Sequence, residues 1–229
     1  SALFFRAEAL VQQGQHAEAR KGYLDFAERE PDHRFAPQAR FRAAEAVYLA
    51  GNARAAQTEL EKFLADHPGS ALNVYAQKYL AELALAARDG PRAAALFKEI
   101  LERNPDGPQV DECRFGLGRA LELQGDIESA RIAYQTMTAA NGPLADDAQV
   151  QTGICLYNHG DYPQAAKAFQ TALERFPDSD LTGQARYWLG MCQVAQHDWD
   201  RAAQTLRSAL DSHPQHALAP SMTFWLADS

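Results

Sequence analysis

The chain has 229 residues, with 22 Lys and Arg against 30 Asp and Glu, and a formal net charge of −8. This balance argues against a nucleic-acid partner and against general affinity for anionic lipid, because both need a positive protein surface. No apolar run approaches the roughly 18–20 residues that cross a bilayer, so no direct membrane span is expected. The three cysteines are an odd number, and we expect Cys113, Cys155 and Cys192 to be small buried residues rather than a disulfide framework.

Six windows of the sequence, which begin at residues 14, 51, 88, 125, 160 and 197, align without gaps. Each has Ala at one position and a large apolar residue four positions later, and in five of them Pro follows eight positions further on. A small residue stands twelve positions before each Ala: Ala7, Ala44, Ala81, Gly118, Gly153 and Gly190. Self-similarity at a fixed period is typical of repeat architectures.

In chain order the predicted repeats are 1–33, 34–70, 71–107, 108–143, 144–179 and 180–216, and 217–229 begins a seventh. Apolar residues three and four apart predict two amphipathic helices in each repeat. In the fifth repeat the first helix is predicted over 144–158, with Gly160 as a left-handed cap. The second is predicted over 162–175, because Pro177 cannot continue a helix. The pairing of Gly153 with Ala165 is expected to mark the close helix crossing, and the lack of period-two alternation makes strands unexpected.

These residues resemble the tetratricopeptide repeat. The family pattern is matched by the Leu117-Gly118 and Leu189-Gly190 pairs and by Ala165, Phe169, Ala172 and Pro177. The resemblance covers nearly the whole chain and implies an all-α, right-handed superhelical solenoid of antiparallel helix pairs, formed by residues 1–229 as one array. The repeats run 35–37 residues rather than the usual ~34, and the first three carry Ala where the family often has Gly. The longer unit is similar to repeats of bacterial cell-envelope proteins such as the Tol-Pal coordinator and the outer-membrane assembly lipoprotein.

No sequence motif for catalysis or for a cofactor is present. The chain has no Gly-rich phosphate loop, HExxH, GxSxG or paired-Cys metal motif, and the GLG at 116–118 falls inside a predicted helix. His213 and His216, with Asp211 nearby, could in principle bind a metal, but a solvated turn is the preferred interpretation. We therefore expect no catalytic residue, no metal and no cofactor.

The resemblance implies that the first helices line an inner groove. This places eleven residues there as candidate partner contacts: Phe41, Glu45, Tyr48, Lys78, Glu82, Phe115, Arg119, Glu122, Tyr157, Tyr187 and Met191. The groove would be acidic in its N-terminal half and apolar in its C-terminal half, which suits an extended or helical peptide with basic and apolar residues. The alternative is that Phe41, Phe115 and Tyr187 pack between neighbouring first helices while the Glu side chains are solvated.

The preferred function is a non-catalytic scaffold or adaptor that binds a protein partner. The chain is expected to be part of a larger protein, because it does not begin with Met and its repeat pattern is cut at the end. The resemblance implies that this protein is bacterial and lies in the periplasm or cell envelope. Two alternatives stay open: a recruiting or regulatory domain of a larger enzyme, and a cytoplasmic chaperone or secretion adaptor, which three free thiols would favour. The array end offers a surface for self-association.

Overall fold

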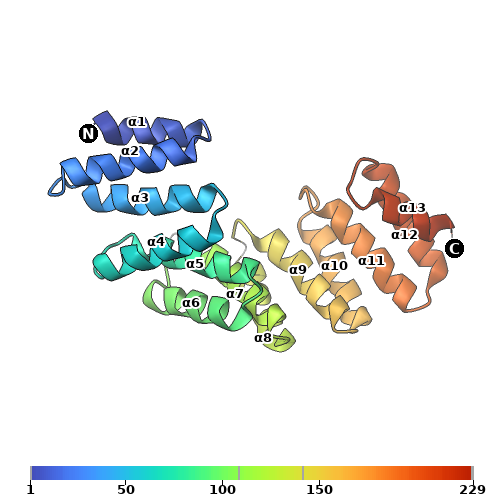
Figure 1. Cartoon of the computed structure of the whole chain (residues 1–229). Helices are drawn as coiled ribbons and strands as arrows, with labels where there is room; N and C mark the ends of the chain where they lie inside the picture. Colours follow the sequence, from blue (N-terminus) through green and yellow to red (C-terminus); the bar gives the residue numbers. More distant parts are fainter. Residues whose placement is uncertain (1, 108, 141, 228–229) are drawn as a thin grey trace. The chain divides into compact units, whose positions relative to one another are not determined.

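The computed structural model describes residues 2–107, 109–140 and 142–227, and within these ranges all regular secondary structure is α-helix (Figure 1). The helices are α1 (Ala2–Gln12), α2 (His16–Arg29), α3 (Ala36–Leu49), α4 (Ala53–Asp66), α5 (Asn73–Ala86), α6 (Gly90–Arg103), α7 (Val110–Leu123), α8 (Ile127–Ala140), α9 (Ala145–Asn158), α10 (Tyr162–Arg175), α11 (Thr182–Ala195), α12 (Trp199–Ser212) and α13 (Ala219–Ala227). The bounds of α9 and α10 confirm the two helices predicted for the fifth repeat.

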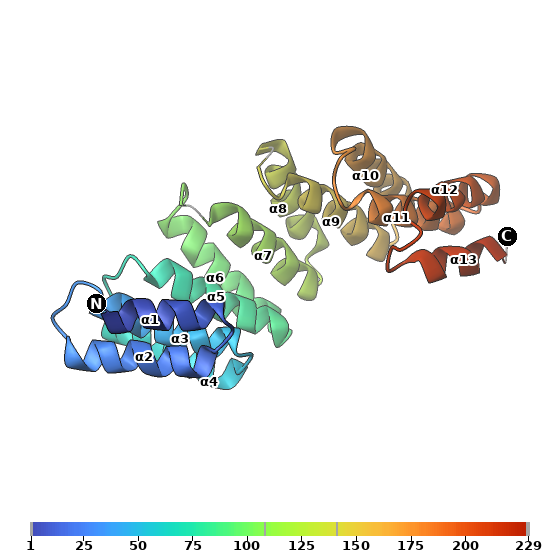
Figure 2. The same ribbon diagram turned by 90° about the horizontal axis from the view of Figure 1, so that it is seen from above.

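The helices group into two compact units, an N-terminal unit of residues 1–105 and a C-terminal unit of residues 106–229. In the N-terminal unit, α1 to α6 each pack against the next helix in sequence, and α3 also contacts α5 (Figure 1, Figure 2). In the C-terminal unit, α7 to α13 do the same, and α9 also contacts α11. Helices with odd numbers are the first helices of the repeats and those with even numbers are the second helices. Within each unit, consecutive first helices are therefore neighbours.

The turn inside each hairpin contains one residue in the left-handed region of backbone conformation. Gly160 has φ +85°, which confirms the predicted cap, and glycine adopts this conformation without a clash because it has no Cβ. The six left-handed residues stand at the starts of the six aligned windows: Gly14, Gly51, Arg88, Gly125, Gly160 and His197. Arg88 and His197 thus take a conformation that costs an L-residue with a side chain about 1–2 kcal/mol.

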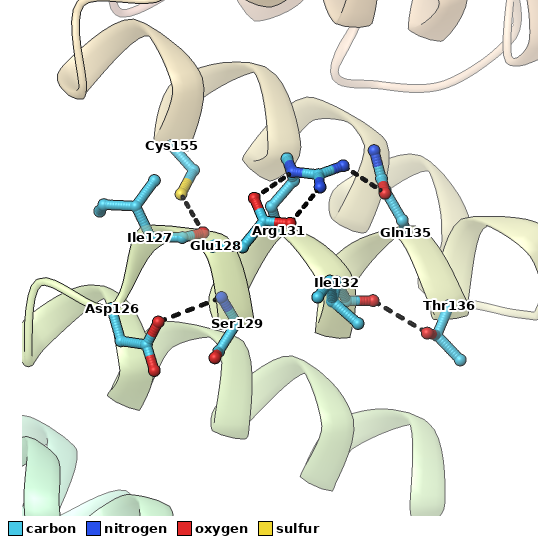
Figure 3. Close-up of polar contacts among 9 residues, drawn as sticks. All are labelled: Asp126, Ile127, Glu128, Ser129, Arg131, Ile132, Gln135, Thr136 and Cys155. Atoms are coloured by element: carbon cyan, nitrogen blue, oxygen red, sulfur yellow. Dashed lines mark hydrogen bonds and ion pairs between the residues drawn. The ribbon is translucent and has the colours of Figure 1, made fainter.

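Acidic or amide side chains cap four of the second helices. The side chain of Asp161 accepts a hydrogen bond from the backbone N–H of Gln164 at 3.2 Å, and Asp126 accepts one from Ser129 at 3.2 Å (Figure 3). Asn52 and Asp89 occupy the same position in their repeats and make the same bond. Each cap satisfies one of the N–H groups that a helix start leaves unpaired.

Five of the second helices, α2, α4, α6, α10 and α12, end two residues before a proline. Phe176, the residue before Pro177, has φ −128° and ψ 58°, because a residue before proline is excluded from helical conformation. A side chain stabilises the turn between a second helix and the next first helix. It accepts a hydrogen bond from the backbone N–H two residues later in the chain. Ser179 accepts from the N–H of Leu181 at 3.1 Å, and Nδ1 of His216 accepts from Leu218 at 3.1 Å. Ser179 thus binds an amide inside the turn itself.

The core of each hairpin forms where a small residue of the first helix meets the large residue of the second. A Cβ placed on Gly153 would lie 2.6 Å from two ring atoms of Phe169, and Phe169 is fully buried. Gly118 faces Tyr134 and Gly190 faces Leu206 in the same way. The space beside Gly153 is therefore filled by the ring of Phe169, and Ala165 on the same second helix is fully buried.

Candidate partner-binding site

The eleven candidate contacts all lie on first helices, but their side chains have different environments. Phe41 is 4% exposed and packs with Phe63 and Leu80 in the core of the N-terminal unit, so for this residue the packing alternative holds and its ring is not available to a partner. Met191 is also buried, at 8% exposure, and Glu45 at 9%. Half-buried positions are held by Tyr48, Lys78, Glu82, Phe115, Glu122, Tyr157 and Tyr187, and Arg119 is exposed.

The acidic row of the N-terminal unit begins with Glu8 on α1. Its carboxylate accepts a hydrogen bond from the hydroxyl of Tyr23 on α2 at 2.8 Å. The guanidinium of Arg42 on α3 lies 3.5 Å from the same oxygen. Glu8 therefore links three helices rather than standing free in solvent.

Glu45 continues the row one repeat later and is almost completely enclosed. One carboxylate oxygen accepts a hydrogen bond from the hydroxyl of Tyr79 on α5 at 2.7 Å, and the other accepts one from Arg42. A buried carboxylate needs this kind of partner, because an unpaired buried charge is costly. Glu45 is therefore not solvated, so that alternative was wrong for this residue, and its carboxylate is already paired within the chain.

Glu82 on α5 completes the row. Its carboxylate accepts a hydrogen bond from the hydroxyl of Tyr48 on α3 at 2.7 Å, and Nζ of Lys78 lies 3.6 Å from its other oxygen. The rings of Tyr48 and Tyr79 are 4.5 Å apart between centroids. The three carboxylates of the row thus have two cations and three tyrosine hydroxyls of the chain itself as partners.

The tyrosines of this network remain protonated donors. Burial and the neighbouring carboxylates raise the pKa of Tyr23, Tyr48 and Tyr79 above the ordinary value for a phenol, because an anionic phenolate would be poorly solvated and would lie beside another anion. The network therefore keeps its hydrogen bonds at neutral pH, and it joins α3 to α1 and to α5.

In the C-terminal unit the corresponding face has a polar group around Glu122 on α7 and aromatic side chains on α9 and α11. Glu122 on α7 accepts hydrogen bonds from the hydroxyl of Tyr134 at 2.7 Å and from the amide of Gln151 at 3.1 Å. Phe115 packs against the ring of Tyr134, with centroids 5.6 Å apart. Glu122 is therefore internally paired, like the acidic row of the other unit.

Four aromatic side chains meet where α9, α10 and α11 come together. The ring of Tyr157 on α9 lies 5.0 Å from Trp188 on α11 and 5.2 Å from Tyr162 on α10. Tyr187 lies 5.4 Å from Trp188. The contacts of Tyr157 with Trp188 and Tyr162 and of Tyr187 with Trp188 are edge-to-face, and all four side chains are half-buried. We call Tyr157, Tyr162, Tyr187 and Trp188 the aromatic patch.

Sequence reasoning missed Tyr162 and Trp188. A signal was present for Trp188, because it shares its place in the repeat with Arg42, Tyr79 and Gln151. Each of these three contacts the preceding first helix in its own unit. In these repeats that position therefore contributes to the contact between neighbouring first helices.

The described residues offer little for catalysis or for a metal. They contain no group of three or more His, Cys, Asp or Glu that could hold a metal ion. Cys113, Cys155 and Cys192 form no disulfide with one another and are buried, which confirms the expected small buried residues. Burial raises the pKa of Cys155 and Cys192 to about 12, so neither thiol is a ready nucleophile.

Two polar hollows lie along the second helices. One, of about 350 Å³ in the N-terminal unit, is lined by Arg20, Arg40 and Glu59 among others, and Arg20 and Glu59 are joined by a 2.6 Å ion pair. The other, of about 460 Å³ in the C-terminal unit, is lined by Glu128 and Arg131 among others, and these two are also paired (Figure 3). Each hollow thus contains one ion pair between side chains of opposite charge.

Family models of helix-pair repeats match this chain along most of its length. A family model for a tetratricopeptide repeat-like domain matches residues 1–154, and a tetratricopeptide repeat model matches residues 150–217 and 193–229. No curated protein matches the sequence.

Solved structures similar to this chain confirm the all-α solenoid class. MamA from Desulfovibrio magneticus RS-1 is 19% identical, with a TM-score of 0.65 over 78% of this chain and 96% of that chain. The C-terminal part of a TPR repeat-containing protein from Cytophaga hutchinsonii is 17% identical, with a TM-score of 0.69 over 92% and 79%. A tetratricopeptide repeat protein from Parabacteroides merdae is 14% identical, with a TM-score of 0.64 over 99% and 96%. At these identities the likeness shows the fold alone.

Proposed function

Because the chain belongs to the tetratricopeptide repeat family, we propose that it is a non-catalytic scaffold that binds a segment of a partner protein on the faces of its first helices. Proteins built from such repeats stack their units into extended surfaces that suit partner binding.

The observation that carries the proposal is the aromatic patch. Aromatic side chains contribute a large share of the binding energy at protein interfaces, because they bury much area and lose little conformational freedom. Tyr157 and Tyr187 were both candidate contacts from the sequence, and in the structure each is half-buried within one continuous group of rings. Tyr157 and Tyr187 are thus the members of the eleven-residue set best suited to hold a partner, together with Tyr162 and Trp188 beside them.

The other candidates take supporting roles in this proposal. Glu45, Glu82 and Glu122 hold neighbouring helices together through tyrosine and cationic partners, so they shape the surface without supplying free charge. Phe115 and Arg119 reach solvent on α7 and are available to extend the contact. The expectation of a partner with basic residues depended mainly on free glutamates in the groove, and these three glutamates are paired within the chain.

The parent protein is proposed to be bacterial and associated with the periplasm or cell envelope, on the strength of the long repeat unit. None of the described helices combines the length and apolar character that a membrane crossing requires. The cytoplasmic alternative rested on free thiols, but these are shielded from oxidants by burial, so their presence is compatible with either compartment.

A photo-crosslinking amino acid at Tyr187, introduced in the parent protein in its own cells, tests the proposal. The matched control carries the same group at Ile132, which is 52% exposed on the second helix α8. A discrete adduct from Tyr187 alone, identified by mass spectrometry, is expected and would name the partner. The same diffuse adducts from both positions would show that the first-helix face is not the binding surface.

A further inference from the structure

The aromatic patch differs from the tyrosines of the N-terminal unit in the state of its polar groups. Tyr23, Tyr48 and Tyr79 each donate to a glutamate of the chain. By contrast, the hydroxyls of the three patch tyrosines have no hydrogen-bond partner among the described residues, and none is buried away from water. The patch therefore presents hydroxyl groups that are free to donate to a bound molecule.

Trp188 adds a donor that is poorly satisfied within the chain. Its indole Nε1 is buried and has no acceptor among the described residues. A buried donor without a partner is destabilising, and tryptophan can only donate at this atom. For this N–H to meet an acceptor on a partner, the half-buried ring would have to turn toward the surface of the patch.

The patch also lacks charge. Burial raises the pKa of Tyr157, and the groups that add to this effect are Tyr162, Cys192 and Tyr187, none of which is ionised at neutral pH. The carboxylate next to Tyr162 in sequence belongs to Asp161, which is engaged as the N-cap of α10. A partner held here would gain little from basic or acidic side chains.

The Trp188 N–H can only donate and the tyrosine hydroxyls can also donate, so the uncharged patch favours a peptide that exposes its backbone carbonyls. A helical partner uses its backbone carbonyls in its own hydrogen bonds, so it would leave the donors of the patch unpaired. A polyproline II segment has no internal hydrogen bonds and exposes its carbonyls. Proline also brings an apolar ring and no N–H, and aromatic-lined surfaces bind such segments in other folds.

We propose that the aromatic patch binds an extended, uncharged, proline-containing segment of the partner, with the Trp188 indole and the tyrosine hydroxyls donating to its backbone carbonyls. The proposal rests on the proposed scaffold function and specifies its partner. The sequence suggested an extended or helical peptide with basic and apolar residues. The proposal replaces it with a peptide that is extended, uncharged and contains proline.

Titration of the full chain with a decaproline peptide tests the proposal. Indole ¹H–¹⁵N resonances report on Trp188, Trp199 and Trp225 separately once each is assigned by substitution with Phe. We expect the Trp188 resonance to move on binding while that of Trp199, which is 50% exposed on α12, does not. The affinity for decaproline should be the same at low and at high salt, because no ion pair is involved.

Two substitutions separate the indole N–H from the ring surface. Trp188→Phe keeps an aromatic ring and removes the donor, and it should weaken decaproline binding about 3- to 10-fold, as expected for one hydrogen bond. Tyr157→Ala removes a ring and should weaken binding about 10-fold or more. Trp199→Phe is the matched control and should leave affinity unchanged, with circular dichroism to verify that each variant is folded.

Three outcomes would overturn the proposal: no decaproline binding, equal binding by Trp188→Phe, and tighter binding of an uncharged amphipathic helical peptide of the same length. A partner crosslinked at Tyr187 in cells, combined with any of these outcomes, would leave the scaffold function standing and remove only the proline-containing class of partner. Failure of both experiments would remove both proposals.

Discussion

Substituting Gly153 by alanine tests the packing that holds each hairpin together. The added Cβ would lie 2.6 Å from Cε1 and Cζ of Phe169 and 2.9 Å from its Cδ1, which is closer than real side chains approach. Phe169 is fully buried, so its ring must move into its neighbours, and such overpacking costs about 1–3 kcal/mol. Alanine regains about 0.5–1 kcal/mol over glycine inside a helix. The expected net loss in the free energy of unfolding is therefore about 0.5–2 kcal/mol.

Urea unfolding followed by far-ultraviolet circular dichroism measures this loss. Gly69→Ala is the matched control, because a Cβ at Gly69 meets no atom within 4 Å, and its effect should stay within about 0.5 kcal/mol. A double-mutant cycle with Phe169→Ala isolates the contact. In that background Gly153→Ala should no longer destabilise the protein. An equal loss in both backgrounds would refute the packing argument and with it the assignment of the hairpin core.

Three further changes test the turns, the buried network and the buried tyrosines. Arg88→Gly should raise the free energy of unfolding by about 0.5–1 kcal/mol, because Arg88 has φ +59° and glycine removes the strain; unchanged stability would contradict this. Glu45→Gln should lower it by about 1–3 kcal/mol, whereas Glu61→Gln, in an exposed pair, should change it by less than about 1 kcal/mol. Burial and the Glu122 carboxylate raise the pKa of Tyr134 in the folded protein. Tyr134 therefore contributes its full stabilisation of the fold below the pKa of an unfolded tyrosine, about 10. Above that pH the free energy of unfolding declines by up to about 1.4 kcal/mol per pH unit. Urea unfolding between pH 9 and 11.5 should show a shallower decline for Tyr134→Phe, and equal slopes would contradict the assignment.

The sequence predicted the helices and turns because their signals are local. Pro177 prevents the helix from continuing, and Asp161 caps the next helix only three residues from the amide that it binds. Gly160 marks a left-handed turn that its own backbone requires. The same spacing identified the large residue Phe169 as the side chain that fills the hairpin. Each of these features depends on a few neighbouring residues and on helical geometry, so the alignment of six windows was enough to locate them.

The chemistry of the first-helix faces depended on residues that are distant in sequence. Tyr48 and Tyr157 occupy the same place in their repeats, yet the hydroxyl of Tyr48 is bound by Glu82 while the ring of Tyr157 meets Trp188. The bound group comes from the next repeat in each case, 34 residues away for Glu82. Periodicity tells which face a residue occupies, but only the packing of neighbouring helices decides whether its polar atoms are paired.

Glu45 shows why the candidate site could not be completed from the sequence. Helical spacing placed it on the inner face, where a glutamate is ordinarily solvated. The structure surrounds it with Arg42 and Tyr79, so that 9% of the residue remains exposed. The local sequence determined the repeat, its helices and its turns, because these follow from short-range sterics and hydrogen bonding. The tertiary structure decided which side chains remain free for a partner, because burial and pairing depend on what the adjacent helices bring to the same place.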